Sequence, residues 1–198
     1  MLNMDITWTD AILSLGIGVG LAAAAGFRVF IPLLLLGIAA RMHVLNLNEG
    51  FAWLGSVPAI GAFAIATVVE IGAYYIPAID NFLDFLTAPL AVVSGVLAAA
   101  AVITDMPPLL RWFLVIVAGG GTAGVVQGLT SIVRLKSTVF TAGLGNFVIA
   151  TLEWIGSLIA SMIAILAPLI AMATTGIFLI VVFVAGNRLK NSGTNDRG

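Results

Sequence analysis

Four ionisable residues stand inside apolar stretches of this 198-residue chain: Arg28, Glu70, Arg134 and Glu153. A charge at the centre of a bilayer costs roughly 2.5–3.5 kcal/mol on insertion scales, so such residues face the protein interior, pair or meet water. Two acids and two bases suggest two ion pairs, and we expect Arg28 with Glu153 and Arg134 with Glu70. Such a centre indicates a site for a solute, an ion or a proton. Static ion pairs that fix helix register are the structural alternative.

Polar residues recur at helical spacing around Arg134. A dehydrated solute needs replacement hydrogen bonds, so a hydroxyl-lined face of this kind is typical of a pathway wall. Beyond it, the glycine-containing break at 141–146 frees backbone groups that can line a cavity. The predicted pathway residues are Arg28, Glu70, Gln127, Ser131, Arg134, Thr138, Thr141, Asn146 and Glu153.

Two apolar segments with one acid each resemble one another: Phe63–Ala73 reads FAIATVVEIGA and Phe147–Ser157 reads FVIATLEWIGS. A glycine-spaced helix and then a basic residue precede each copy. The pattern predicts an internal repeat, residues 9–104 and 105–186, although two apolar helices can also match by chance. The halves are inverted if segments 28–43 and 129–145 re-enter, and parallel if only one crosses fully; the sequence leaves this open.

The composition is 61% hydrophobic and 9% charged, against about 25% charged in soluble domains. It predicts an all-α membrane protein with about six transmembrane helices plus two short re-entrant or broken helices. Residues 1–186 form one polytopic domain, and 187–198 form a polar, disordered tail. The predicted crossings are 11–27, 56–75, 89–104, 109–128, 146–166 and 169–186, with short elements at 29–42 and 130–145.

The charges near the membrane ends set the expected orientation and partners. Arg188, Lys190 and Arg197 place the C-terminus in the cytoplasm by the positive-inside rule. Residues 77–87 suit a short helix lying in the membrane interface. The lipid bilayer is the expected surrounding, and a net charge of −1 gives no reason to expect nucleic acid.

Little in the sequence indicates catalysis or a cofactor. There is no cysteine, the single histidine, His43, lies in a loop, and Asp80 with Asp84 is only a weak metal candidate. We therefore expect no catalytic residue, metal or cofactor. The spaced glycines are typical of helix-packing faces, which would also suit contacts between copies in a homo-oligomer: Gly16, Gly20, Gly120, Gly124 and Gly128.

Three blocks in this order resemble a bacterial integral-membrane family catalogued only as a domain of unknown function. They are GFRVFIPL at 26–33, Glu70 followed by IPAID at 76–80 and Leu83-Asp84, and TAGLGN at 141–146 leading to Glu153. The resemblance extends from about Leu13 to Ala167. It implies a small multi-span inner-membrane protein and brings no activity with it.

Two functions from different classes fit these residues. The first is a transporter or channel for a small solute or ion, built on the charged cluster. The second is a non-transporting membrane scaffold or assembly factor whose buried charges are structural. An intramembrane enzyme comes third, because no nucleophile–base pair or metal-ligand cluster stands at recognisable spacing.

Overall fold

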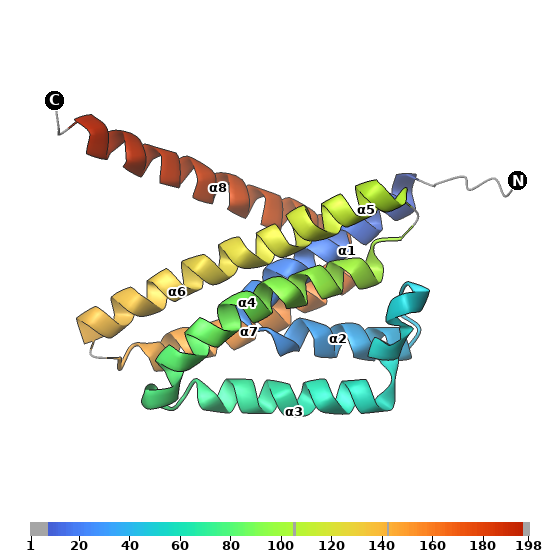
Figure 1. Cartoon of the computed structure of the whole chain (residues 1–198), viewed down its shortest axis with the longest axis horizontal. Coiled ribbons are helices and arrows are strands. Elements are labelled where there is room, and N and C mark those ends of the chain that lie inside the picture. The colour runs from blue at the N-terminus through green and yellow to red at the C-terminus, as the bar shows by residue number, and fades with distance from the viewer. Residues whose placement is uncertain (1–7, 105, 142, 196–198) are drawn as a thin grey trace, which may run out of the picture.

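The structure is a computed structural model that describes residues 8–104, 106–141 and 143–195, without the side chains of 77–82, 84 and 189–195. Over this part the chain is helical, with the elements arranged as in Figure 1. In chain order they are α1 (Trp8–Phe27), α2 (Phe30–Arg41), the 3₁₀-helix η1 (Glu49–Gly55), α3 (Val57–Ala73), α4 (Pro77–Val102), α5 (Pro108–Leu114), the π-helical stretch η2 (Val115–Gly120), α6 (Gly121–Thr141), α7 (Asn146–Leu166) and α8 (Pro168–Asn195).

Length and composition make this chain a multi-pass membrane protein. Within the described residues, five helices are long and apolar enough to cross a bilayer: α1, most of α4, the continuous run Pro108–Thr141, α7 and most of α8. The pair η1 and α3, bent by 62° at Ser56, makes a sixth if it counts as one span. Helix α2 has 12 residues and is about 18 Å long, too short to cross alone. The predicted all-α membrane fold is confirmed.

Small residues let the helices of the bundle approach closely. A Cβ on Gly16 would lie 2.7 Å from the carbonyl oxygen of Pro168, and one on Gly20 would lie 2.7 Å from the Cβ of Ala164. A Cβ on Gly18 would lie 3.3 Å from the Cα of Ala99 in α4. Helix α1 is therefore held against α7, α8 and α4 by van der Waals contact between backbones, the usual means of helix association in lipid. The expected packing role of Gly16 and Gly20 is confirmed.

The centre of the bundle is built from alanines and a few leucines. The run Ala98–Ala101 of α4 packs with Leu21, Leu33, Leu36 and Leu54, which are all buried. Many larger apolar side chains point outward instead, among them Ile65, Val68, Leu135 and Phe183. This distribution suits a surface in contact with lipid tails.

Helix α4 differs from its prediction. A short interfacial helix over 77–87 and a separate span from Pro89 were expected, but one helix runs from Pro77 to Val102 with Pro89 inside it. Proline removes one backbone donor, and that loss is tolerated in membrane helices where neighbouring groups satisfy the freed carbonyl.

Two further segments, 130–145 and 187–195, also differ from expectation. The segment 130–145 is no separate short element, because α6 continues to Thr141 and a turn then leads into α7 at Asn146. The tail from Asn187 was expected to be disordered, but α8 extends to Asn195. Both segments are polar, and polarity alone does not end a helix when no proline or capping residue interrupts it.

Two turns lie at the same end of the bundle. In Figure 1 the turn from α3 to α4 and the turn from α6 to α7 lie at the end opposite to η1 and the start of α1. Helices α3 and α7, which hold the two similar segments, run in opposite directions there. Helix α2 has no counterpart between α6 and α7. The internal repeat stays a prediction.

Candidate functional site

The site is organised around the break between α1 and α2. Helix α1 ends at Phe27 and α2 begins at Phe30, so Arg28 and Val29 lie between two helices that leave the break in different directions. A break of this kind frees backbone N–H and C=O groups, which need other partners in a membrane. Side chains of three other helices supply them.

Glu70 of α3 closes the N-terminus of α2. One carboxylate oxygen accepts a hydrogen bond from the N–H of Val29 at 2.9 Å, and the other accepts one from the N–H of Phe30 at 3.2 Å. A helix N-terminus carries partial positive charge and free N–H groups, so a carboxylate is stabilised there.

Two serines bond the carbonyl groups near the same break. The hydroxyl of Ser94 in α4 donates to the carbonyl oxygen of Val29 at 2.8 Å, and that of Ser157 in α7 donates to Ala24 at 2.9 Å. All three partners of the break are buried. The break is thus a fully embedded feature of the fold.

Glu153 of α7 bridges the two arginines. Its carboxylate lies 3.1 Å from a terminal nitrogen of Arg28 and accepts a hydrogen bond from Nε of Arg134 at 3.0 Å, with a second contact to Nη2 of Arg134. Nη2 of Arg28 also donates to the carbonyl oxygen of Ala150 at 3.2 Å. Exposed fractions are 1% for Arg28, 3% for Arg134 and 5% for Glu153. Removing one member of such a buried set costs about 3–5 kcal/mol.

Both guanidinium groups contact the ring of Tyr74. The central carbon of Arg28 lies 3.7 Å from the ring centroid and that of Arg134 lies 4.0 Å from it. The Tyr74 hydroxyl is 2.9 Å from the hydroxyl of Thr87, to which the Gln127 amide donates at 3.4 Å. Desolvated cation–π contacts are worth about 2 kcal/mol or more. Tyr74 therefore holds the two cations in place and links them to α4.

The predicted polar face of α6 extends from this cluster toward the turn into α7. Gln127 also donates to Ser131 at 3.5 Å, one turn before Arg134. Beyond Arg134, the hydroxyl of Thr138 accepts from the side-chain amide of Asn146 at 3.0 Å. Gln127 and Ser131 therefore bond to the cluster through Thr87, and Thr138 with Asn146 continues the same polar row one turn beyond Arg134.

Thr141 departs from that row. Its hydroxyl donates to the carbonyl oxygen of Ser137 at 2.7 Å and accepts from the N–H of Gly145 at 2.8 Å, and its side chain is exposed. These bonds close the turn at the end of α6. Thr141 therefore serves the turn and lies at the edge of the site.

The expected ion pairs are half confirmed. Arg28 with Glu153 is present, but Arg134 also bonds Glu153, where Glu70 had been predicted. The reason is topological: α6 and α7 form a hairpin that brings Arg134 to Glu153, whereas Glu70 bonds the N-terminal start of α2. The side chains of Asp80 and Asp84, the weak metal candidates, lie outside the described residues.

The cluster lies toward the end of the bundle that holds the two turns. Glu70 is one turn from the end of α3, and Glu153 is about two turns from the start of α7. Both helix ends belong to the end of the bundle with the two turns (Figure 1). About two helical turns therefore separate Glu153 from that end of the bundle.

An apolar pocket of about 440 Å³ reaches the cluster from the side. It lies between the end of α1 and helices α6, α7 and α8, and Glu153 is one of its two polar lining residues. Thr130 is the second polar residue of this pocket. Its apolar lining residues are Phe27, Val126, Leu129, Val133, Ile149, Leu152 and Phe178. A second pocket, of about 530 Å³, lies at the other end of α2.

The predicted pathway residues do not include Tyr74, Thr87, Ser94 or Ser157, which the structure brings to the site. Tyr74 follows Glu70 by one helical turn, so helical spacing signals it directly. Ser157 follows Glu153 by one turn in the same way. Nothing in the spacing around Ser94 links it to Val29, 65 residues away.

The fold and the buried charges define a polytopic helical membrane protein with a polar cluster at a helix break. Residues 15–188 match the sequence model of the family described as "Domain of unknown function (DUF4126)", and the chain belongs to this family. Neither a curated protein nor a solved structure matches the sequence.

Proposed function

We propose that this protein is a transporter or channel for a small solute or ion, in a bacterial inner membrane, with its C-terminus in the cytoplasm. The observation that carries the proposal is the break at Arg28, where Glu70, Arg134 and Glu153 converge from three further helices. Broken helices with charges at the break form the substrate and ion sites of many transporters.

The cost of these charges supports a functional role. Buried ion pairs can often be replaced by apolar side chains without loss of stability, so a bundle that only needed to stay folded would not require them. Thr138 and Asn146, at the far end of the polar row, supply hydrogen-bonding groups between the cluster and the end of the bundle that holds the two turns. We take the arrangement with both arginines bonded to Glu153 as the closed state of this path.

Proteoliposomes test the proposal directly. Purified protein should accelerate the volume recovery of vesicles challenged with potassium chloride or urea, followed by light scattering, or should conduct in planar bilayers. Glu153→Gln, incorporated to the same level, should change the rate, while Lys136→Gln, an exposed base on α6, should not. Wild-type activity with an unchanged Glu153→Gln rate would refute the assignment of the cluster.

Cysteine labelling tests the path itself. The chain has no cysteine, so single replacements have no background. A water-soluble maleimide should label Ser131→Cys and Thr138→Cys, on the polar row, faster than Ile132→Cys and Val139→Cys, which face outward. Equal protection of both sets would contradict a water-filled path in any state that the protein visits.

A scaffold or assembly factor is the second candidate, and one observation favours it: Arg28 and Arg134 both bond the carboxylate of Glu153. If these bonds are only structural, Glu153→Leu should prevent folding, and the triple replacement Arg28→Leu, Arg134→Leu and Glu153→Leu should restore much of it. Restored folding together with unchanged vesicle permeability would favour the scaffold.

The proposal requires no catalytic residue, metal, cofactor or nucleic acid, and the lipid bilayer is its medium. Gly16 and Gly20 are occupied by contacts within the chain, whereas a Cβ on Gly128 would meet nothing within 4 Å. We offer the Gly128 face of α6 for contacts between copies. Crosslinking through Gly128→Cys tests that role.

A further inference from the structure

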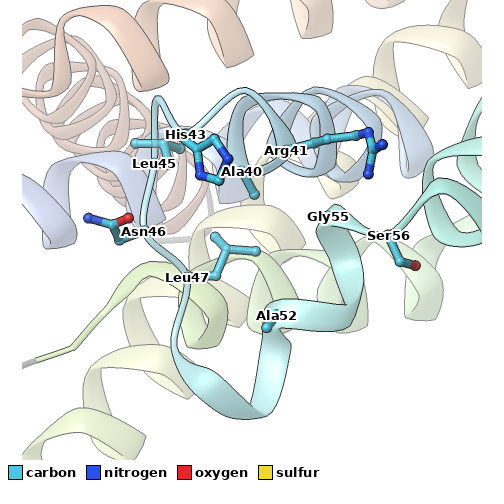
Figure 2. Close-up of a pocket in the computed structure, with 9 residues that line it drawn as sticks. All are labelled: Ala40, Arg41, His43, Leu45, Asn46, Leu47, Ala52, Gly55 and Ser56. Carbon is cyan, nitrogen blue, oxygen red and sulfur yellow. The ribbon is translucent and has the colours of Figure 1, made fainter.

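The second pocket lies at the opposite end of α2 from the charged cluster. Its walls are the C-terminal end of α2, the segment that follows it and η1 (Figure 2). Its volume of about 530 Å³ is in the range of small-ligand sites. Asn48 N–H bonds the carbonyl oxygen of Ala101, which ties this segment to the end of α4.

The side chains around this pocket favour an anion. Among its lining residues, all of them described, two are basic, Arg41 and His43, and none is acidic. In Figure 2 the guanidinium of Arg41 lies on the side of Gly55 and Ser56, and the imidazole of His43 lies on the side of Ala40. Both side chains are exposed. Nitrogen donors therefore stand at two sides of a water-accessible pocket.

His43 stands in a backbone conformation that normally belongs to glycine. Its φ is 57°, and it is the one non-glycine residue with positive φ in the described part of the chain. The N–H of His43 bonds Ala40 and that of Val44 bonds Ala39, at 3.1 and 2.9 Å. This is the Schellman arrangement at a helix end, where glycine or asparagine is preferred. A histidine there costs backbone free energy, and residues held in such conformations concentrate at functional sites.

We propose that this pocket binds a small molecule through a phosphate or carboxylate group. The planar fork of Arg41 suits two hydrogen bonds to one such group, and His43 and the amide of Asn46, on other sides of the pocket, supply donors for further polar groups of the ligand. Leu45 and Leu47 give the rest of the pocket an apolar wall. A soluble phosphate ester and a phospholipid headgroup share this chemistry. The site is independent of the transport proposal, because it uses none of the cluster residues.

The single histidine of the chain provides the measurement. The ¹⁵N-labelled imidazole of His43 gives one set of resonances, which should shift saturably when glycerol 3-phosphate is added to protein in a neutral detergent. Loss of a hydrogen bond to a charged group corresponds to about a tenfold change in affinity or more. Arg41→Gln should weaken binding by that factor, Arg41→Lys by less, and Lys136→Gln not at all. Equal affinity of wild type and Arg41→Gln would overturn the site.

Replacement of His43 separates binding from structure. His43→Gly relieves the positive-φ conformation, so the variant should denature at a higher temperature than wild type while it binds glycerol 3-phosphate more weakly, as measured by equilibrium dialysis. A merely structural histidine predicts unchanged binding in the stabilised variant. That result would overturn the proposal.

Nanodiscs distinguish the two sources of the anion. A shift of the His43 resonances in phosphatidylglycerol nanodiscs, and none with glycerol 3-phosphate, assigns the pocket to a lipid headgroup. A shift with glycerol 3-phosphate in phosphatidylcholine nanodiscs assigns it to a soluble ligand. No saturable shift under either condition would refute an anion site.

Discussion

The carboxylate of Glu70 accepts a hydrogen bond from the backbone N–H of Val29 at 2.9 Å, and so α3 closes the start of a helix 41 residues upstream. This bond makes the break between α1 and α2 depend on a side chain that is distant in the sequence. It also separates the roles of the two acids, because Glu70 bonds backbone donors and Glu153 bonds the arginines.

Glu70→Ala should destabilise the protein by about 1–3 kcal/mol, because it leaves the N–H groups of Val29 and Phe30 buried without their acceptor. Glu70→Gln should lose less, since its amide oxygen accepts one of the two bonds. Thermal denaturation in detergent, followed by tryptophan fluorescence, measures both. Glu49→Gln, at an exposed site in η1, should stay within about 0.5 kcal/mol of wild type. Equal loss at Glu49 and Glu70 would contradict the capping role.

Glu153→Gln should be the most damaging single change in the cluster, at about 3–5 kcal/mol, because two buried guanidinium groups share its carboxylate. Urea denaturation in mixed micelles, or the folded yield on size exclusion, gives the ranking. Arg134→Lys keeps the charge but loses the two-nitrogen fork, so its stability should lie between wild type and Glu153→Gln. A Glu153→Gln protein as stable as wild type would show that the bridge carries no net stability.

Tyr74 offers a graded test of the cation–π contacts. Tyr74→Phe keeps the ring and loses the bond to Thr87, which should cost about 0.5–1.5 kcal/mol. Tyr74→Leu also removes the ring from both guanidinium groups, which should cost about 2 kcal/mol more. Melting temperatures should therefore fall in the order wild type, Phe, Leu. If Tyr74→Phe and Tyr74→Leu have the same melting temperature, the contacts between the ring and the guanidinium groups add no stability.

Gly20 and Gly128 form a matched pair for testing the packing of α1. Gly20→Ala places a methyl 2.7 Å from the Cβ of Ala164 and 2.8 Å from that of Ala171, so α7 and α8 must shift, at about 1–3 kcal/mol. Gly128→Ala meets nothing within 4 Å in a single copy of the chain and removes a flexible glycine from α6, so the stability of the monomer should rise by about 0.5–1 kcal/mol. Denaturation midpoints of the two variants should move in opposite directions.

The sequence allowed the class of fold and most helix positions to be predicted, because a helix in lipid must be long and apolar. The break at Arg28 was also predictable, since a charge and Pro32 interrupt an apolar run. Segment 77–87 was predicted to be a short interfacial helix, separate from the span that begins at Pro89, but one helix runs through both. Segment 187–195 was misread because its polarity was taken to end a helix, whereas local backbone bonds continue through it.

The members of the site were predictable, but their partners were not. Burial cost alone identifies Arg28, Glu70, Arg134 and Glu153, since each is an ionisable group in an apolar stretch. Which acid meets which base depends on how the helices pack, and the hairpin of α6 and α7 decides it for Arg134. The long-range bond from Ser94 to Val29 has no sequence signal at all.

The alanine-rich contact between α1 and α4 has a thermodynamic consequence. Alanine and glycine have no side-chain torsions to freeze, so docking these two helices sacrifices almost no rotamer entropy. The association therefore relies on close fit of two nearly smooth surfaces. One methyl group added at this contact should therefore destabilise the protein more than the removal of one.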